Sequence, residues 1–580
     1  MSKLNIDQQT TYQLFSDKKS DFLIPDYQRP YAWGDTECQT LWDDIFAFAF
    51  PENDCDKFKK DDEYFLGPIV TFKNHGKQEI IDGQQRLTTL MLLLRAFHTK
   101  FLNMQDKNSV SIRNSIAKCI WKADEFDNLI EDELKIESQV STDDDKEEFL
   151  YILRNGEAQK GFKSRYANVF RFFQKKIDDF IGSFPAYCAY LPARIMYNCI
   201  LLPIEAETQD SALRIFSTLN DRGLPLSDSD IFKAEFYKYF TSRGKKDYFI
   251  EKWKELESLC EKIFHPTSGT PMDELFTRYM YYERSKLGIK SSTTEALRKF
   301  YEKNDYELLK TDGVFENLIT LAYFWDDIAN QNNDRFSDEI LRKLFMLNYA
   351  PNGMWTYFVS VYFMANKNDD GLLDDTAFIA FLDRITAFIW AYAVTNPGVN
   401  ALRTPVYAEM VKVVKGYPAE FSDFKFDLGA VRNVMTNFGY YNARPITKAM
   451  LTWWAYTMPE QQLYPLETPL EIEHIYARNR NEKEHSLSDP RSVELLGNKS
   501  LLEKRINIRA SDYRFEDKKS FYKGFTNKRG QKKEGTKIHE LITLSDIKTD
   551  FTESDIRDRN EMILSSFLKY LSDNGLARYN

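Results

Sequence analysis

The hydrophobic pattern of this chain changes near residue 245 from a mixture of strand and helix periods to an almost purely helical one, and this change constrains the fold most. From 248 to 450 the helical pattern is nearly continuous and rich in Tyr, Phe and Trp. A chain of 580 residues also exceeds the roughly 250–300 residues that one hydrophobic core supports. We therefore expect an α+β, predominantly helical protein of several domains.

Three domains are predicted from these changes of pattern: a mixed α/β domain at 1–245, a helical connector at 246–458, and a C-terminal domain at 459–580 that begins with the linker Pro459–Pro469. The aromatic stripes of the connector are expected to pack its helices, with a stacking or cofactor role as the alternative. The first domain contains three expected strands and one expected buried helix, which are Glu63–Phe72, Glu79–Ile81, Asn198–Glu205 and, for the helix, Leu87–Phe97.

Composition excludes several classes of protein. Hydrophobic residues make up 43% of the chain, with only 23 Gly and 19 Pro, so disordered and collagen-like classes are excluded. The six cysteines form no Cys-x-x-Cys pair, which argues against a zinc ribbon or a disulfide scaffold. No apolar run reaches the roughly 20 residues of a membrane span, and the first residues lack the apolar core of a signal peptide. We expect a cytoplasmic protein that does not bind membranes.

Charge is distributed unevenly. The net charge is −10, but 122–148 holds twelve acidic against three basic residues, whereas 499–533 holds twelve basic against four acidic ones. The acidic block is expected to be a solvated helix face or loop. The basic block could neutralise a nucleic-acid backbone, and its candidate phosphate contacts are Lys504, Arg505, Arg509, Arg514 and Lys519.

The segment Leu470–Ile475 alternates apolar and polar residues, as a strand does, and ends in the acid-histidine pair Glu473-His474. A near-neutral imidazole can take a proton from water during phosphodiester hydrolysis. A hard divalent cation held by oxygen ligands can stabilise the charge that develops on the phosphate. The alternative is that His474 is an ordinary buried strand residue.

Further polar residues follow along the chain. Asn498 lies in the run Leu495–Leu502, Asn507 comes nine residues later in an expected helix, and Lys518 eleven after that. The order Glu-His, Gly-Asn, Asn, Lys is a specific pattern, although Asn507 could instead cap a turn.

A second candidate site lies at Asp82-Gly83-Gln84-Gln85-Arg86, where an expected strand ends and a helix begins at once. Such a turn directs unpaired backbone N–H groups outward, and an arginine in the first helical turn can bind phosphate oxygens. Asp82 could orient a metal-bound water or a ribose hydroxyl. No G-x-x-x-x-G-K-[ST] run exists, so a P-loop is excluded. The alternative is a structural corner with Arg86 in a salt bridge.

Two segments accompany this turn. One is 215–226 with the following Ser227–Lys233, and the other is 24–33. In the latter, the aromatic and polar side chains either sense a modified base or backbone, by stacking and edge hydrogen bonds, or brace the nucleotide site. The residues concerned are Tyr27, Gln28, Arg29, Tyr31 and Trp33.

Together these segments resemble GmrSD-type, or type IV, restriction enzymes. The C-terminal residues are similar to the variant of the HNH (ββα-metal) nuclease motif found in that family, although Tyr476-Ala477-Arg478 stands where relatives commonly have a proline. The resemblance implies that His474 is the general base, that Glu473 and Asn507 hold one Mg²⁺ or Mn²⁺ ion, and that Asn498 fixes the loop orienting His474. Lys518 completes the catalytic set.

The N-terminal segments resemble the other domain of the same family, with a fold similar to the ParB/sulfiredoxin group. The resemblance implies that Asp82, Gly83, Gln84, Gln85 and Arg86 bind and hydrolyse an NTP, which could be GTP, ATP or CTP. The helical connector matches the family only by position.

The expected activity is that of an NTP-dependent HNH endonuclease that senses modified DNA in bacterial anti-phage defence. Its expected partners are double-stranded phage DNA and a nucleotide, with a homodimer as one form of assembly. One alternative is a phosphorothioate-sensing NTPase and nicking enzyme that works with partner proteins. Another is a nucleotide-regulated DNA-binding protein that does not cleave.

Overall fold

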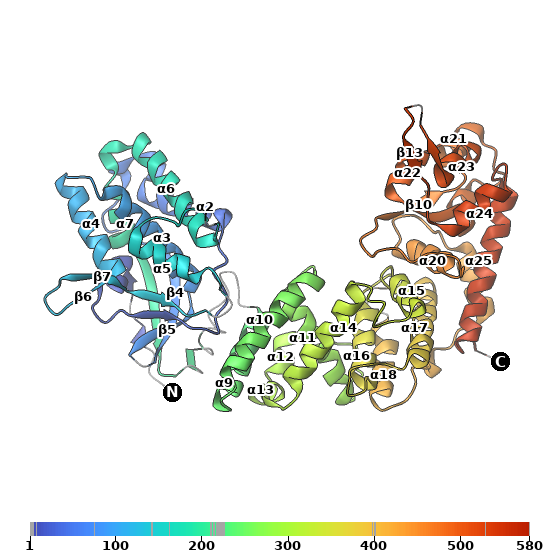
Figure 1. The fold of residues 1–580 in the computed structure, drawn as a ribbon, viewed down its shortest axis with the longest axis horizontal. Coiled ribbons are helices and arrows are strands. Elements are labelled where there is room, and N and C mark those ends of the chain that lie inside the picture. The colour runs from blue at the N-terminus through green and yellow to red at the C-terminus, as the bar shows by residue number, and fades with distance from the viewer. Residues whose placement is uncertain are drawn as a thin grey trace. The chain divides into compact units, whose positions relative to one another are not determined.

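The computed structural model describes residues 5–6, 8–74, 76–140, 143–161, 163–208, 211–212, 215, 227–396, 398, 402–527 and 529–578. The chain forms two compact units, Met1–Lys254 and Glu255–Asn580, and each is described by itself (Figure 1). The predicted division into three domains remains a prediction, because these units are defined by packing alone.

Within its described residues, the first unit is built around a mixed seven-stranded sheet in the order β1-β9-β4-β5-β3-β8, with β2 also paired to β9. β4 runs parallel to β9 and antiparallel to β5, and β3 runs parallel to both β5 and β8. The strands are β1 (Asn5–Ile6), β2 (Gln9–Thr10), β3 (Phe22–Ile24), β4 (Tyr64–Asn74), β5 (Lys77–Asp82), β8 (Ile136–Ser138) and β9 (Cys199–Ala206).

Helices cover this sheet, and the central one is α3 (Gln84–Phe101). α3 is buried on nearly every side, and its buried residues include polar ones such as Arg95 and His98. It packs on β4 and β5 residues and against α4, α5 and α6. The other helices of this unit are α1 (Thr11–Ser16), α2 (Asp35–Ala49), α4 (Lys107–Ile120), α5 (Lys146–Asn155), α6 (Arg165–Ser183), α7 (Tyr190–Asn198) and α9 (Asp228–Ser242), with short 3-10 turns at Pro51–Asn53, Cys55–Lys57 and Pro185–Tyr187.

The acidic block at 122–148 differs in part from its prediction. Most of its acidic side chains are exposed, and it includes a turn and the start of α5, but it also contains strands: β6 (Trp121–Ala123) pairs with β7 (Leu129–Leu134), and β8 joins the main sheet. Asp143 is buried and accepts hydrogen bonds from the Tyr166 hydroxyl, 2.5 Å, and the Tyr31 amide, 3.5 Å. Short apolar positions between the acids, such as Leu134 and Ile136, anchor this segment in the core.

The second unit begins with a helical array (Figure 1). From α10 to α20 all described elements are helices or turns, as the continuous helical period predicted. They are α10 (Lys246–Ile263), which starts in the first unit, α11 (Pro271–Lys286), α12 (Leu297–Tyr301), α13 (Lys303–Tyr306), α14 (Val314–Ala329), α15 (Asp338–Leu347), α16 (Met354–Asn366), α17 (Asp375–Thr395), α18 (Arg403–Val414), α19 (Leu428–Asn437) and α20 (Pro445–Tyr456), with 3-10 turns at Glu307–Lys310 and Ser422–Phe424.

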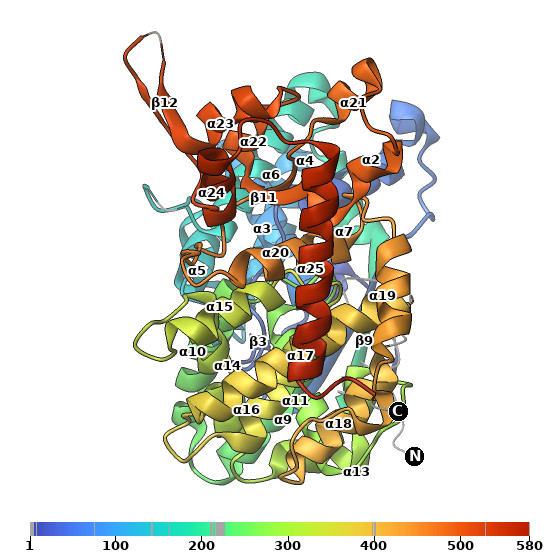
Figure 2. The ribbon, with the colours of Figure 1, turned by 90° about the vertical axis from the view of Figure 1, so that its right-hand side faces the viewer.

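The C-terminal elements pack directly on this array. α25 (Glu553–Asp573) lies along α17 and α19, and α20 lies against β11 (Figure 2). Trp453 of α20 contacts Phe567 of α25 edge to face. The remaining elements are β10 (Leu470–His474), α21 (Arg478–Glu484), β11 (Lys499–Glu503), α22 (Lys504–Ala510), α23 (Phe515–Lys523), β12 (Gly524–Thr526), β13 (Lys532–Glu534) and α24 (His539–Ile547), with 3-10 turns η6 (Pro490–Glu494) and η7 (Leu496–Asn498).

One described helix, α17, is long and apolar enough to cross a membrane by length and composition. Most of its apolar window is buried inside the unit. Its Asp383 accepts hydrogen bonds from Lys343, 2.8 Å, and the Tyr570 hydroxyl, 2.7 Å. Burial and polar pairing of this kind are features of a core helix.

The predicted local elements are confirmed in the described residues. Strands occupy the segments predicted around 63–72, 79–81 and 198–205, and α3 includes the predicted buried helix. β10 and α22 likewise lie where a strand and a helix were expected. The predicted motif at 216–226 lies outside the described residues.

Candidate functional site

β10 and β11 form an antiparallel pair that carries the predicted acid-histidine pair. His474 lies opposite Lys499, and Glu473 lies opposite Ser500. Because successive strand residues point to opposite faces, Glu473 and His474 are directed to different sides of the pair, whereas Glu471 shares the face of Glu473. β10 therefore presents a different polar environment on each of its two faces.

Asn498 holds the loop that follows His474. This side chain is fully buried; its Oδ1 accepts a hydrogen bond from the Tyr476 amide at 2.7 Å, and its Nδ2 donates to the carbonyls of Tyr476 and Val493, both at 3.0 Å. The Ile475 amide also donates to the Asn498 carbonyl at 2.9 Å. Asn498 thus fixes the backbone on the C-terminal side of His474.

The His474 side chain is 11% exposed, and its Nε2 makes no hydrogen bond within the described residues. The carboxylate oxygen Glu494 Oε2 lies 3.9 Å from this nitrogen, which is too far for a hydrogen bond. Burial lowers the pKa of His474, with further lowering from Lys499 and Arg478, and Glu494 only partly opposes this. His474 is therefore neutral near pH 7, as a general base must be.

Glu494 sits between cations beside His474. Its Oε2 accepts from the Lys499 ammonium at 2.5 Å, and its Oε1 from Arg478. Although burial acts to raise the pKa of Glu494, His474 and Lys499 lower it to about 2, so this carboxylate is ionised. Lys499 is completely buried and also donates to the Tyr440 carbonyl and to Asn442 Oδ1. The face of His474 is thus a network of paired charges.

On the other face, Glu473 is 3% exposed and belongs to a buried cluster. Its Oε1 accepts from the Lys518 ammonium at 2.7 Å and from the Tyr522 hydroxyl at 2.5 Å. Lys518 also donates to the His474 carbonyl at 2.7 Å. Burial raises the pKa of Glu473, and the lowering by Lys518 and Tyr522 does not fully compensate. Lys518 therefore ties Glu473 to the backbone of His474.

Asn507 lies on α22 and has Glu471 as its partner. Its Nδ2 donates to Glu471 Oε2 at 3.0 Å. Lys504, one turn earlier on α22, lies 3.7 Å from Glu471 Oε1. The structure therefore places Asn507 on the same face of β10 as Glu473, but hydrogen bonded to the preceding acid on that face.

A divalent cation is implied for this site by the predicted motif. The Glu473 carboxylate and the Asn507 amide offer the oxygen ligands that hard cations prefer, and both belong to elements that pack together. The hydrogen bonds from Lys518 and Tyr522 both go to Glu473 Oε1. Among the described residues, no group of three or more His, Cys, Asp or Glu side chains could hold a metal ion, so a cation here would have to share the Glu473 carboxylate with the Lys518 ammonium.

The predicted phosphate-contacting cations lie on α22 and α23 or just before them. Lys504, Arg505 and Arg514 are exposed, and Arg514 pairs with Glu484. Arg509 and Lys519 are partly buried and donate to the carbonyls of Glu534 and Lys548 at 3.0 and 2.6 Å. Fewer cations are therefore exposed than the basic block of the sequence suggested. Of the exposed ones, Arg505 is the nearest in sequence to Asn507.

In the first unit, the predicted strand-turn-helix corner is shaped by two glycines. Gly83, the N-cap of α3, has φ +93°, and a Cβ there would lie 2.3 Å from Ile69 Cδ1. Gly67 has φ +120°, and a Cβ there would lie 3.0 Å from the Arg86 guanidinium. Arg86 thus lies across Gly67 and donates to the Pro68 carbonyl at 2.9 Å. Only glycine allows both approaches.

Asp82, Arg86 and Arg29 form the charged part of this corner. Burial raises the pKa of Asp82, while Arg86, the Gly83 amide and Arg29 lower it in part. Arg29 Nε is buried and makes no hydrogen bond within the described residues. The two guanidinium groups and the N-terminus of the 18-residue helix could bind phosphate oxygens here, whereas Asp82 is an acceptor and could only orient a water or a hydroxyl.

The two glutamines of the predicted nucleotide box bind the protein itself. Gln85 accepts from the amides of Ala32, 2.7 Å, and Trp33, 3.3 Å, and donates to the Pro30 carbonyl, 3.1 Å. Gln84 donates to the Arg29 carbonyl at 3.2 Å. These hydrogen bonds hold the predicted sensing segment against the N-terminus of α3. The predicted nucleotide-binding residues and the predicted sensing residues therefore lie side by side.

The sensing segment is itself mostly buried. Tyr27, Gln28 and Tyr31 are each 6% exposed, and Gln28 donates to the carbonyls of Ile80 and Ile81. Tyr31 pairs with the Thr89 hydroxyl at 2.7 Å and stacks on Tyr166. Such contacts favour a bracing role for these side chains, whereas Arg29 and the partly buried Trp33 can still meet a ligand.

Sequence reasoning missed the neighbours of His474, namely Glu494, Lys499 and Arg478. A weak signal was present, because Lys499 lies in a short segment between the apolar pairs Leu495-Leu496 and Leu501-Leu502. A cation that such a segment carries into the core needs a buried counter-ion. The identity of that counter-ion depends on the register of β10 and β11, which a single sequence leaves open.

Two family models match the chain. The N-terminal domain model of the GmrSD restriction endonucleases matches residues 11–237, and the C-terminal domain model of the same enzymes matches residues 430–566. No curated protein matches the chain. The two matched domains, one at each end, define a restriction endonuclease. The chain belongs to the GmrSD restriction endonuclease family, and its substrate is accordingly DNA.

Proposed function

We propose that this restriction endonuclease hydrolyses DNA phosphodiesters by an HNH-type mechanism with His474 as the general base. The observation that carries the proposal is the state of His474: a neutral imidazole whose Nε2 makes no hydrogen bond within the described residues, next to a loop clamped by Asn498. A group of this kind can accept a proton from an attacking water, a contribution of typically about 10²–10⁴-fold.

Protonated His474 would be stabilised by Glu494, which is ionised and 3.9 Å from Nε2. Lys499 and Arg478 hold Glu494 in place. Lys518, through its bond to the His474 carbonyl, holds the backbone of the base from the opposite face. The base is thus positioned from both faces of β10.

Glu473 and Asn507 would hold one Mg²⁺ or Mn²⁺ ion, which would supply charge stabilisation at the phosphate and the leaving oxygen. In the structure, Glu473 is already paired with Lys518. Neutralising Lys518 should therefore raise the affinity of the site for a divalent cation, because the ammonium and the ion compete for one carboxylate.

The corner formed by Asp82, Arg86 and Arg29 is proposed to bind and hydrolyse an NTP. Arg86 and Arg29 would contact phosphate oxygens, and Asp82 would orient a water or a ribose hydroxyl. Gln84 and Gln85 would act indirectly, since their hydrogen bonds position the segment that contains Arg29. Trp33 and Arg29 would report a DNA modification to the same corner.

Modified phage DNA is the proposed target, in the cytoplasm, with a homodimer as one form of assembly. The deciding experiment compares plasmids of one sequence that are unmodified, glucosyl-hydroxymethylated or phosphorothioated, with each of GTP, ATP and CTP and with Mg²⁺ or Mn²⁺. Cleavage confined to glucosyl-hydroxymethylated DNA supports the proposal. Cleavage of phosphorothioated DNA alone would replace it with the phosphorothioate-sensing alternative.

One observation favours a different function, in which the C-terminal part binds DNA without cutting it. Glu473 is already neutralised by Lys518 in a buried cluster, as in a purely structural ion pair. Strand scission separates the two functions: if neither metal supports cleavage with any nucleotide, the binding function is correct.

A further inference from the structure

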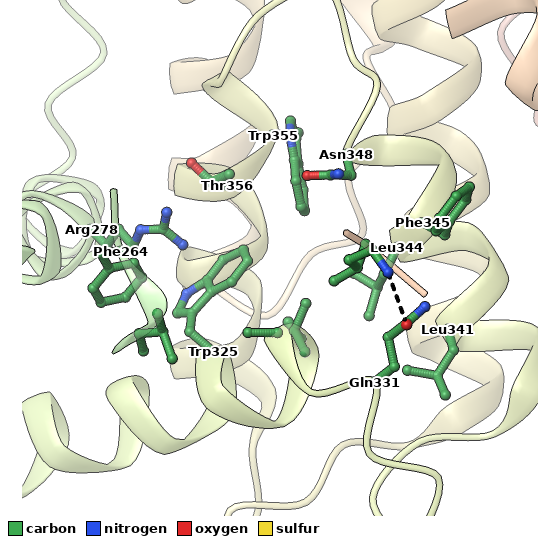
Figure 3. A pocket seen from close by; sticks show the side chains of 14 residues that line it. Phe264, Arg278, Trp325, Gln331, Leu341, Leu344, Phe345, Asn348, Trp355 and Thr356 are labelled. Carbon is green, nitrogen blue, oxygen red and sulfur yellow. Dashed lines mark hydrogen bonds between the residues drawn. The ribbon is translucent and has the colours of Figure 1, made fainter. Parts of the chain in front are cut away.

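The helical array is joined to the elements of the candidate site at two places. At the first, Gln331 of the array accepts a hydrogen bond from the Leu466 amide at 3.2 Å and donates to the Tyr464 carbonyl at 2.9 Å, beside a largely apolar cavity of about 200 Å³ (Figure 3). At the second, α25 packs against α17 and α19 of the array and also against η7, which contains Asn498. α25 therefore extends from the array to the loop that clamps the backbone after His474.

Close packing between α25 and η7 depends on Gly497. A Cβ at this position would lie 1.9 Å from the Ile556 carbonyl oxygen and 2.6 Å from the Asn560 backbone nitrogen, so a larger residue could not approach the helix as closely. The Gly497 amide also donates to Asn560 Oδ1 at 3.2 Å. The loop and the helix are thus in contact through their backbones.

Arg559 of α25 binds the backbone on both sides of Asn498. The residue is 6% exposed, and its Nη1 donates to three carbonyl oxygens, at 2.9, 3.0 and 2.8 Å. Because Nη1 carries two hydrogens, two of these carbonyls share one. The three oxygens belong to Leu496, Gly497 and Lys499.

Glu540 of α24 binds the other edge of the same guanidinium. Arg559 Nε and Nη2 each donate to the Glu540 carboxylate at 2.7 Å, and Trp454 Nε1 donates to it at 2.7 Å as well. The planar guanidinium can serve both edges at once, whereas a lysine could balance the charge of Glu540 but could not supply the same set of directed donors. An ion pair alone would need only Glu540, so the carbonyl contacts call for a further role.

The segment that Arg559 holds is connected to the candidate base in two ways. Asn498 accepts hydrogen bonds from the two amides that follow His474 in the chain. The Lys499 ammonium donates to Glu494, the carboxylate beside His474. A shift of η7 away from α25 would therefore move the backbone of the base and its charged neighbour together.

We propose that Arg559 is a positioning residue of the nuclease, which fixes Asn498 and Lys499 through their backbone and thereby sets the orientation of His474. The inference rests on the proposed role of His474 as the general base. Small misplacements of a reacting group can cost a large part of the rate. Because Arg559 is buried and acts through the loop, its replacement should lower kcat and leave KM for DNA unchanged.

Three variants of the full chain separate positioning from a purely structural ion pair. Arg559→Lys keeps the positive charge opposite Glu540 but loses the directed donors to the carbonyls. Trp454→Phe removes one hydrogen bond to Glu540 and leaves every carbonyl contact of Arg559 in place. Arg557→Lys is the matched control, because Arg557 is an exposed arginine on the same helix.

Cleavage kinetics on plasmid DNA that the wild type cuts provide the first measurement. Arg559→Lys should lower kcat by at least about tenfold at an unchanged KM, whereas Trp454→Phe should lower the unfolding midpoint but not kcat. Arg557→Lys should match the wild type. Equal losses of kcat in Arg559→Lys and Trp454→Phe would overturn the proposal. If Arg559→Lys does not fold, Asn560→Ala, which removes the acceptor of the Gly497 amide, must lower kcat in the same way or the proposal is wrong.

Hydrogen exchange separates a failure of this inference from a failure of the proposed function, since it needs no cleavage of DNA. The amides of Ile475 and Tyr476 should exchange at least about tenfold faster in Arg559→Lys than in the wild type, and at the wild-type rate in Arg557→Lys. Unchanged exchange in Arg559→Lys would refute the positioning of this loop, even where the wild type cuts DNA. Faster exchange together with full cleavage by His474→Ala would support the positioning and refute the proposed base.

Discussion

His474 lies among charges of both signs, and these set the pH range in which it can serve as a base. Burial, Lys499 and Arg478 all favour the neutral imidazole, whereas Glu494 favours the protonated form. The net pKa lies below the ordinary value of 6.5. Because a general base acts in its neutral form, the acidic limb of the cleavage rate should fall below pH 6.5.

Replacing Glu494 by Gln removes the group that raises the pKa of His474. The imidazole then loses its proton more readily, so the acidic limb of kcat/KM should move to still lower pH. The measurement is the pH profile of plasmid cleavage for wild type and Glu494→Gln at fixed ionic strength. A limb that moves to higher pH, or does not move, would contradict the charge network described for His474.

Single residues also mark the limit of prediction from sequence. Glu473, His474 and Asn498 could be recognised because their order and spacing follow from the motif. The use of Gln84 and Gln85 as backbone clamps could not, since it depends on where the segment at 30–33 lies in space. Local sequence specifies which groups are present, whereas partners distant in the chain are chosen by the tertiary fold.

At the scale of elements, the junction of β5 and α3 depends on glycine. Gly83→Ala would place a Cβ 2.3 Å from Ile69 Cδ1, at a backbone φ of +93°. We expect a loss of roughly 1–3 kcal/mol in the free energy of unfolding, through strain and a clash. Gly161→Ala is the control, because Gly161 has φ +83° but an added Cβ would meet nothing within 4 Å.

Chemical denaturation of the full chain, followed by circular dichroism, measures the difference. Gly161→Ala should lower the free energy of unfolding by about 1 kcal/mol or less, which is the effect of the left-handed conformation alone. Equal destabilisation by the two substitutions would mean that the contact between Gly83 and Ile69 does not constrain this corner.

The elements themselves were the most predictable part of the fold. β4, β5, β9 and α3 follow from periodicity, and so does the helical array from α10 to α20. In the acidic block, the exposure of most acidic side chains was predicted, but its strands were missed because charge density was given more weight than the short apolar positions that place β8 in the sheet. The order of the strands in the sheet could not be predicted either, because β3 pairs with strands more than fifty residues away.

At the scale of the whole molecule, the acidic and basic blocks fall in different compact units. The block 122–148 belongs to the first unit, and 499–533 to the second. DNA should therefore be held chiefly by the second unit, and its affinity should fall steeply as salt rises.

Arg505→Ala tests this placement, because Arg505 is exposed on α22 beside Asn507. The slope of log K against log salt should become shallower by about 0.9, the value of one phosphate contact. Lys160→Ala, an exposed cation of the first unit, should leave the slope unchanged. Binding of a short duplex at several salt concentrations provides the measurement, and a reversed ranking of the two variants would refute the placement.

The central claim is that this member of the GmrSD family cuts DNA with His474 as its base. The most direct measurement is cleavage of modified plasmid by His474→Ala beside His485→Asn, a change at an exposed histidine whose left-handed φ of +48° asparagine tolerates. We predict that His474→Ala abolishes cleavage while NTP hydrolysis stays largely intact, and that His485→Asn cuts like wild type. Cleavage retained by His474→Ala would contradict the account.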